Sequence, residues 1–133
     1  MAIRTRMGVA SMLIAAIAVL APGADAQAPG IKRTLMQRAD LDDRREVIMG
    51  LAEIASGGAT GRHTHFGTEV GYVLEGTSIL EIDGEPARRL GAGDSYVIPA
   101  GKVHDARATG SSPAKVLATY VVDKGKPLAT PAP

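Results

Sequence analysis

The chain has 133 residues, with 15 Lys and Arg against 14 Asp and Glu, three histidines and no cysteine. Because this balance leaves a formal net charge of only +1, the chain lacks the basic surface that attracts nucleic acids and acidic membranes, and we expect neither as a partner. A chain of this length forms one domain, and without disulfides its stability must come from packing, from subunit association or from a bound metal.

Residues 1–26 have the order of a secretory signal peptide. Arg4 and Arg6 make the start basic, residues 8–21 form an apolar run, and a small-x-small sequence ends at Ala26. The apolar run is shorter than the roughly 20 residues that a membrane-spanning helix needs. We therefore expect cleavage after Ala26 and a periplasmic or secreted protein of 107 residues, in which 13 basic and 13 acidic side chains balance.

After the signal peptide, the chain is predicted to have three parts. Residues 27–44 form an N-terminal lead-in, whose strand-like segment Ile31–Gln37 is either an edge strand of its own subunit or an addition to the sheet edge of a second subunit. Residues 45–122 form the main domain. Residues 123–133, rich in Pro and Ala, are expected to form a flexible C-terminal tail with nothing to bury.

The main domain is predicted to be all-β. Short apolar runs of strand length recur between Gly and Pro turns, and such spacing is typical of a sandwich or a barrel. The runs are Val47–Ile54, Val70–Leu74, Ser78–Ile82, Ser95–Ile98 and Lys115–Val122. Asp83-Gly84 predicts a tight hairpin turn. Because no segment has a sustained period near 3.6, we expect little helix beyond one turn at Leu41–Glu46.

The three histidines and one glutamate form a candidate metal site. Residues two apart on a strand face the same side, so His63 and His65 project together. A turn at residues 66–68 returns Glu69 to that side, and His104 follows a Pro-x-Gly turn that brings another strand across. A lone histidine on a strand is more often a surface or core residue. Three imidazoles with one carboxylate, however, favour Zn, Cu, Fe, Mn or Ni over Ca or Mg.

The spacing of these residues resembles the two sequence motifs of the cupin superfamily. The first motif has Gly, five residues, His-x-His, three or four residues, Glu, six residues and Gly. The second has Gly, five residues, Pro-x-Gly, two residues, His, three residues and Asn. The matching positions are Gly57, His63, His65, Glu69 and Gly76, then Gly93, Pro99, Gly101 and His104. Ala108 stands where the second motif has Asn, which is a structural residue in the family and not a ligand.

The resemblance implies a cupin-type small β-barrel, a double antiparallel sheet related to the jelly roll, over residues 45–122. It also implies that four residues bind one divalent transition metal in the interior: His63, His65, Glu69 and His104. Zn or Cu is expected by availability outside the cytoplasm, since affinity for divalent metals rises along the series toward Cu and Zn, and Fe, Mn or Ni remain alternatives. A homodimer is expected from the small core, the absent disulfides and the habit of the family.

The residues other than the four candidate ligands give less information about the function. Parity from Glu69 directs Gly71 inward and Tyr72 outward, whereas Tyr96 and Tyr120 either line the cavity or pack beneath the sheets. Three arginines are either solvated or bind an anionic substrate: Arg62, Arg88 and Arg107. No second acid-base pair is visible near the ligands, so no catalytic residue is assigned.

The site therefore predicts an exported, single-domain, metal-binding cupin with a small-molecule partner. By resemblance, the reaction classes open to it include dioxygenation, decarboxylation, isomerisation and hydrolytic cleavage, in which the ion is a Lewis acid or a template for O₂ and substrate. A metal-dependent dioxygenase or related enzyme acting on a small oxygenated or phenolic compound is the first expectation. The alternative is a non-catalytic cupin that binds a small molecule or a metal for sensing or buffering.

Overall fold

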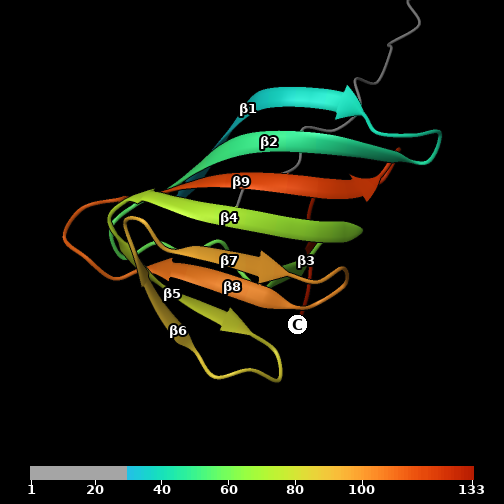
Figure 1. The fold of residues 1–133 in the computed structure, drawn as a ribbon. Coiled ribbons are helices and arrows are strands. Elements are labelled where there is room, and N and C mark those ends of the chain that lie inside the picture. Colours follow the sequence, from blue (N-terminus) through green and yellow to red (C-terminus); the bar gives the residue numbers. More distant parts are fainter. Residues whose placement is uncertain (1–29) are drawn as a thin grey trace, which may run out of the picture.

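The computed structural model describes residues 30–133, and in this range every regular element is a β-strand. The strands form two antiparallel sheets of five strands each (Figure 1). The first sheet has the order β1 (Ile31–Asp40), β2 (Arg45–Ile54), β9 (Ala114–Asp123), β4 (Gly67–Glu75) and β7 (Ser95–Ile98). The second has the order β10 (Thr130–Pro131), β3 (His63–Thr64), β8 (His104–Ala108), β5 (Thr77–Ile82) and β6 (Arg88–Gly91).

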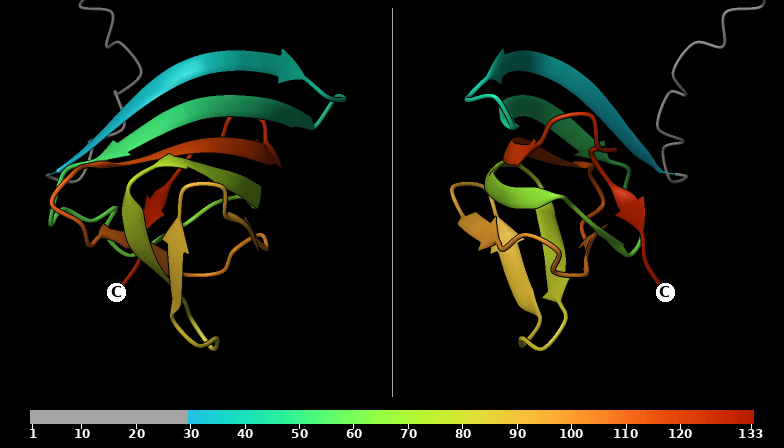
Figure 2. Two further views of the ribbon diagram at one scale, coloured as in Figure 1. Left: turned by 60° about the vertical axis from the view of Figure 1, so that its left-hand side comes forward. Right: turned by 90° about the vertical axis from the view of Figure 1, so that its right-hand side faces the viewer.

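The two sheets pack face to face as a jelly-roll-like sandwich. In Figure 2 the long strands β1, β2 and β9 arch over the shorter strands of the second sheet. The consecutive strands β2, β3 and β4 alternate between the sheets, so the chain crosses repeatedly from one layer to the other. The predicted all-β fold with a double antiparallel sheet is confirmed, and the two sheets stay separate rather than closing into a barrel.

The N-terminal part of the chain is described only from residue 30, so the predicted signal peptide lies outside the described residues. Within residues 30–133 there is no helix long and apolar enough to cross a membrane. Strand β1 pairs with β2 of the same chain and lies at the edge of the first sheet. The predicted helical turn after β1 is wrong. Asp42 instead accepts hydrogen bonds from the N–H groups of Arg44 at 2.9 Å and Arg45 at 2.8 Å, which forms a tight turn into β2.

All five predicted strands of the main domain are present, and the strand-like segment Ile31–Gln37 forms part of β1. Strand β7 has the predicted bounds, and β2, β4, β5 and β9 extend beyond theirs by one to three residues at an end. The predicted hairpin joins β5 to β6, where Gly84 has a φ of 84° and the Glu85 N–H donates to the Ile82 carbonyl at 2.9 Å. The strands for which no apolar run was found in the sequence, β3, β6, β8 and β10, are short. Their extended conformation therefore comes from pairing with neighbours rather than from local sequence.

The core fills the space between the sheets. Alternate residues of β9 face inward and are buried: Val116, Ala118, Tyr120 and Val122. Large apolar side chains from both sheets, including Val73, Leu80 and Ile98, form a buried cluster with Val116. Among the described residues, seven polar or charged ones are buried, and four of these are the candidate ligands. Because buried polar groups cost free energy unless they have partners, these four require a specific explanation.

The C-terminal segment packs against the sandwich. Strand β10 pairs with β3, and Leu128 packs against a buried cluster that includes Tyr120 and Val122. The Leu128 carbonyl also contacts Nδ1 of His65. These contacts correct the expectation that residues 123–133 form a flexible tail with nothing to bury. Pro and Ala predict no element by themselves, and the long-range pairing with β3 is not visible in the local composition.

Candidate metal centre

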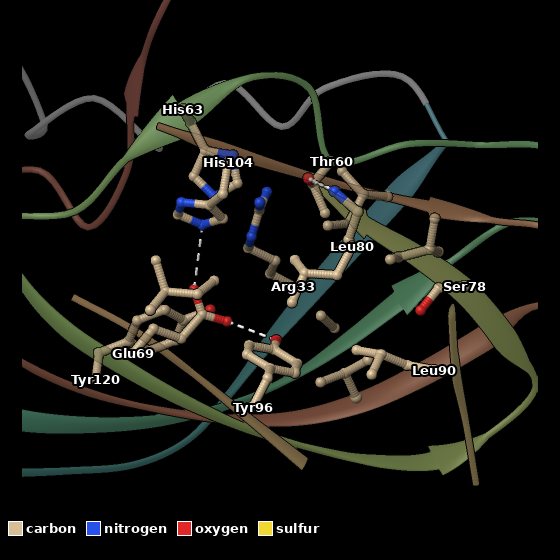
Figure 3. Close-up of a pocket in the computed structure, with 16 residues that line it drawn as sticks. Arg33, Thr60, His63, Glu69, Ser78, Leu80, Leu90, Tyr96, His104 and Tyr120 are labelled. Carbon is tan, nitrogen blue, oxygen red and sulfur yellow. Dashed lines mark hydrogen bonds and ion pairs between the residues drawn. The ribbon is translucent and has the colours of Figure 1, made fainter. Parts of the chain in front are cut away.

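Four side chains carried by three strands meet between the sheets. His63 lies on β3, His65 directly after it, Glu69 on β4 and His104 on β8. Strand pairing places His63 beside His104. The Gly101 N–H donates to the His65 carbonyl at 3.0 Å, which ties the Pro-x-Gly turn before β8 to the segment after β3. His63, Glu69 and His104 also line a pocket between the sheets (Figure 3).

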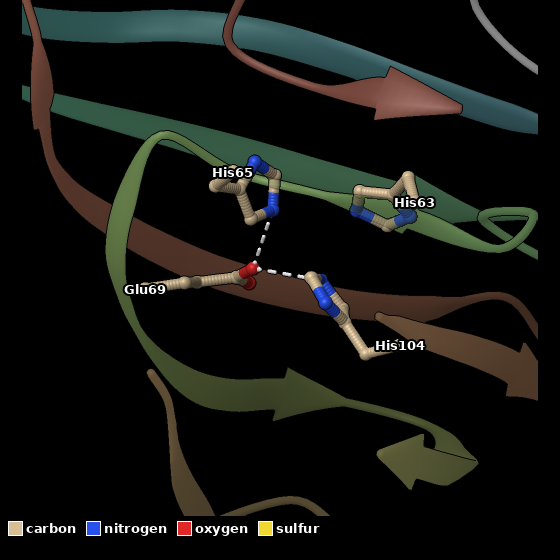
Figure 4. Close-up of side chains that lie close together, drawn as sticks. All are labelled: His63, His65, Glu69 and His104. Atoms are coloured by element: carbon tan, nitrogen blue, oxygen red, sulfur yellow. Dashed lines mark ion pairs between the residues drawn. The ribbon is translucent and has the colours of Figure 1, made fainter. Parts of the chain in front are cut away.

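The cluster is buried and compact. Its four residues are between 3% and 7% exposed, and one ligand atom from each lies within 4.8 Å of the others. Figure 4 shows the three imidazoles and the carboxylate turned toward a common centre. The structure thus brings together all four residues that the motif spacing predicts, and their binding of a metal stays a prediction.

A backbone carbonyl orients each imidazole through its Nδ1 atom. The three pairs are His63 with Gly61 at 2.6 Å, His104 with Lys102 at 2.9 Å, and His65 with Leu128. A carbonyl oxygen only accepts hydrogen bonds, so the proton of each neutral ring lies on Nδ1 and the lone pair lies on Nε2. Metal-binding histidines are commonly oriented in this way, with the ring nitrogen that does not bind the ion donating to a carbonyl.

Two of the Nε2 atoms face the carboxylate. His65 Nε2 lies 2.9 Å and His104 Nε2 lies 3.4 Å from Glu69 Oε2, and both nitrogen atoms are buried without a hydrogen-bond partner. In a low-dielectric interior, nitrogen lone pairs and a carboxylate repel one another unless a positive charge lies between them. A second proton on a ring or a metal ion supplies that charge. Three imidazole nitrogens with one carboxylate fit a divalent transition metal.

The ionisation of the cluster suits a ligand set. Burial lowers the pKa of His63 to about 4, against the opposing hydrogen bond to the Gly61 carbonyl, so the ring is neutral at pH 7. Burial raises the pKa of Glu69, but hydrogen bonds from His104 and His65, when these rings carry a proton on Nε2, and from the Tyr96 hydroxyl outweigh that effect and bring the pKa well below the ordinary value. An ionised carboxylate and neutral imidazoles are the forms that bind a metal ion.

Tyr96 holds the carboxylate in place. Its hydroxyl donates to Glu69 Oε1 at 2.7 Å, which leaves Oε2 to face the imidazoles. Burial, followed by the charge of Glu69, raises the pKa of Tyr96 well above its ordinary value, so the phenol keeps the proton that it donates. The ring has room because its partner on β4 is Gly71. A Cβ atom at Gly71 would lie 2.1 Å from Tyr96 Cζ.

The amino-acid sequence that forms this fold and site matches a known protein family. The family described as Cupin domain matches residues 50–120, which is more than half of the chain. The chain belongs to the cupin family. Among curated proteins, no sequence matches this cupin.

Solved structures similar to this cupin include several enzymes. DMSP lyase DddQ from Ruegeria pomeroyi DSS-3 is 26% identical with a TM-score of 0.60, and the match covers 65% of this chain and 43% of DddQ. KdgF from Halomonas sp. is 28% identical with a TM-score of 0.56, covering 70% of this chain and 80% of KdgF. A recombinant oxalate oxidase in complex with glycolate is 22% identical with a TM-score of 0.63, covering 82% and 58%. The last likeness shows the fold alone, and this cupin spans less than half the length of DddQ.

The other residues singled out in the sequence divide between the cavity and the surface. Tyr72 faces outward, as parity predicts, and is 47% exposed, whereas Tyr96 and Tyr120 line the cavity. The Tyr120 ring also packs edge-on against His65, with 4.9 Å between ring centroids. Ala108, which replaces the motif Asn, is buried at the end of β8, and its N–H donates to the Gly58 carbonyl at 3.0 Å. The strand end is therefore intact.

None of the three arginines considered from sequence lines the cavity. The side chains of Arg62 and Arg107 are 45% and 58% exposed, and Arg62 pairs with Asp83 at 2.8 Å. Arg88 is exposed on β6. The arginine that lines the cavity is Arg33 on β1, in the lead-in segment. No sequence signal indicated it, because its inward direction depends on how β1 pairs with β2.

Proposed function

We propose that this cupin is an exported, metal-dependent enzyme that acts on a small oxygenated or phenolic compound, with dioxygenase-type oxidative cleavage as the first reaction class to test. The observation that carries the proposal is the buried cluster of three imidazoles and one carboxylate, beside a small and mainly apolar cavity. A divalent metal bound there supplies a Lewis acid and a template for O₂ and substrate.

The protein's own residues prepare the site for that role. The carbonyls that pair with the three Nδ1 atoms fix the directions of the imidazoles, and Tyr96 fixes the carboxylate. Loss of such outer contacts typically weakens metal binding or activity about 10- to 100-fold. Aliphatic walls, including Leu80 and Ile98, keep the cavity apolar, which strengthens electrostatic interactions with a bound substrate.

We further propose Zn or Cu as the ion that the exported protein acquires. The signal-peptide pattern supports maturation in the periplasm or outside the cell. In such a compartment the order of divalent affinities places Cu highest and Mn and Fe lowest, and Zn is commonly bound by His and Glu side chains. The ion that supports turnover need not be the ion that binds most tightly, so each of these metals belongs in the test.

A non-catalytic cupin that binds a small molecule or a metal is the second candidate. One observation favours it: burial raises the pKa values of Tyr96 and Tyr120, so neither phenol exchanges its proton readily at pH 7. The similarity to DddQ, a lyase, favours catalysis instead. The two candidates differ in whether a bound compound is consumed.

Oxygen uptake and product formation by the mature protein, loaded with each metal in turn, separate the two candidates. The panel contains small phenols, diketones, thiols and other oxygenated compounds. We expect turnover with at least one metal, and its loss in His65→Ala because one imidazole donor is removed. Thr64→Ala, which changes the residue between the two histidines that faces away from them, should keep turnover. Tight binding without consumption for every metal would contradict the enzyme and favour the binder.

A further inference from the structure

Arg33 lines the metal cavity from the first sheet and is not a member of the ligand cluster. It lies on β1 directly opposite Ala52 on β2, and the neighbouring pair, Ile31 opposite Ile54, is buried. Alternation along β1 therefore turns the Arg33 side chain inward, and the small Ala52 leaves room for it to cross the interior. Figure 3 shows the guanidinium extending into the pocket.

The guanidinium acts electrostatically on several groups of the site. Burial is the largest effect on three neighbouring groups: it lowers the pKa of His63 and raises the pKa values of Tyr96 and Tyr120. The positive charge of the guanidinium is a smaller effect, and it acts to lower all three pKa values. Hydrogen bonding between the guanidinium and the Tyr120 hydroxyl acts on the pKa of Tyr120 in the same direction. Arginine stays charged at any ordinary pH and is costly to bury in apolar surroundings. A sandwich core gains little stability from such a residue. The place of Arg33 beside the candidate metal ligands therefore indicates a role in binding a small molecule.

The charges around the cavity leave positive charge in excess once a metal is bound. A divalent ion contributes two positive charges and Arg33 one, whereas Glu69 is the one carboxylate among the described residues that line the cavity. The excess favours an anionic ligand. Two parallel N–H groups of a guanidinium match the two oxygens of a carboxylate, which makes arginine the preferred partner for that group.

The space beside Arg33 limits the size of the anion. The metal cavity has a volume of about 30 Å³, enough for two or three water molecules. A second pocket of about 80 Å³ shares Arg33, Ala52 and Tyr120 with it, and is otherwise mainly apolar, with Ile48 and Leu128 in its wall. The guanidinium therefore stands between the metal cavity and an apolar pocket, where a short aliphatic chain fits.

We propose that Arg33 is a substrate-binding residue that receives the carboxylate of a small monocarboxylic acid and so holds the acid next to the ligand cluster. This inference rests on the proposed function, because it names the substrate class of the same site. It narrows that class from oxygenated or phenolic compounds to small carboxylic acids. A neutral phenol gives the guanidinium no bidentate partner.

Calorimetric titration of the Zn-loaded protein with acetate and propionate tests the inference without turnover, because Zn has no redox chemistry. We expect the neutral isostere acetamide to bind at least tenfold more weakly than acetate. Arg33→Gln should weaken acetate binding at least tenfold. Arg33→Lys should weaken it by a smaller factor, because lysine keeps the charge but loses the planar fork. Arg88→Gln, at an exposed arginine on β6, is the matched control and should bind as the wild type does.

Three results would overturn the inference: equal acetate affinities in the wild type and Arg33→Gln, acetamide bound as tightly as acetate, or no binding of either acid. The Zn content and thermal midpoint of each variant show whether the cluster and fold are intact. If Arg33→Gln does not load Zn, Arg33→Lys decides the question, and acetate affinity equal to that of the wild type in this variant would overturn the inference. Arg33-dependent acetate binding in a protein that turns over no substrate would contradict the proposed function and leave this inference standing.

Discussion

At the scale of single residues, the two oxygens of Glu69 have different tasks. Oε1 accepts the Tyr96 hydroxyl, whereas Oε2 faces the Nε2 atoms of His65 and His104. The hydroxyl therefore decides which oxygen is presented to the imidazoles and in which direction. Its own position depends on Gly71, because any side chain there would occupy the space of the Tyr96 ring.

Gly71→Ala should destabilise the protein and weaken its metal binding together. The new Cβ would lie 2.1 Å from Tyr96 Cζ and 2.4 Å from its hydroxyl oxygen, so the ring must move and its bond to Glu69 is lost. Overpacking of this kind typically costs about 1–3 kcal/mol. Denaturant unfolding of the metal-free protein measures the first effect, and Zn affinity in competition with a chelator measures the second.

Gly50→Ala is the matched control for this substitution. Gly50 also lies on a long strand of the first sheet, but a Cβ atom there meets nothing nearer than the Thr34 carbonyl oxygen at 3.4 Å. It should therefore change neither stability nor Zn affinity strongly. In a Tyr96→Ala background, Gly71→Ala should add little further cost, because the ring that it displaces is gone. An equal cost in both backgrounds would show that the contact with Tyr96 is not the cause.

At the residue scale, the sequence predicted which side chains come together where spacing along the chain carried the information, and their roles as metal ligands stay a prediction. The pair His63 and His65 needs only strand alternation, and Glu69 and His104 follow from motif spacing. Tyr96 and Arg33 gain their places from the registers of β7 on β4 and of β1 on β2. Those registers join segments far apart in the chain, so no local pattern reveals them.

At the scale of elements, the candidate metal centre depends on a strand of two residues. Strand β3 carries His63 and is held between β8 and β10. Next to it, the Leu128 carbonyl of the segment before β10 accepts the Nδ1 proton of His65. The C-terminal segment therefore supports the site on two counts: it completes the sheet at β3 and orients one imidazole.

Truncation after Lys126 should lower Zn affinity about 10- to 100-fold, the usual effect of removing an outer partner of a metal-binding histidine. The His65 ring loses the carbonyl that keeps its Nε2 atom directed at the centre, and β3 loses its β10 neighbour. Zn affinity by chelator competition checks the expectation. Circular dichroism of the truncated protein confirms that the remaining sheets are formed.

Leu128→Ala is the control for the truncation. It removes side-chain packing against the buried cluster near Tyr120 but keeps the backbone carbonyl. We expect reduced stability, by less than the few kcal/mol typical of a fully buried leucine because Leu128 is only partly buried, with Zn affinity reduced much less than in the truncated protein. If both variants lose affinity equally, packing and not the carbonyl supports the site.

Strands, like single residues, could be predicted from the sequence only where the local pattern carried the information. Strands β2, β4, β5, β7 and β9 carry apolar residues that face the core, so their patterns predict them. Strand β8 instead buries His104 and Asp105 in succession, and β10 contains a proline, so neither has a strand-like apolar repeat. Both owe their pairing to the tertiary fold, which overrides local propensity.

At the scale of the whole molecule, the first sheet exposes apolar side chains on the outer face of β4 and β7. Val70, Tyr72 and Leu74 on β4 and Val97 on β7 are between 43% and 57% exposed. Val70 and Val97 are direct partners across the two strands, so these side chains form one patch. Contiguous exposed apolar patches of this kind mark interaction surfaces.

We expect a second copy of the chain to cover this patch in a homodimer. The patch carries no charge, so its partner must present an uncharged apolar surface, and the same patch of another copy does so in an isologous contact. A chain with a small core and no disulfide also gains stability from such burial. The edge strand β1 lies at the opposite side of the sheet and stays free of this contact.

Val97→Glu should therefore convert the dimer into a monomer, because a dimer would bury a carboxylate without a partner. Size-exclusion chromatography with light scattering at micromolar concentration measures the change. Val97 is 57% exposed, so the monomer itself should keep its fold and thermal midpoint. Leu41→Glu changes a residue that is 53% exposed in the turn between β1 and β2, at the far edge of the sheet, and should stay dimeric. A monomeric wild type would contradict the dimer, and a dimeric Val97→Glu variant would place its interface elsewhere.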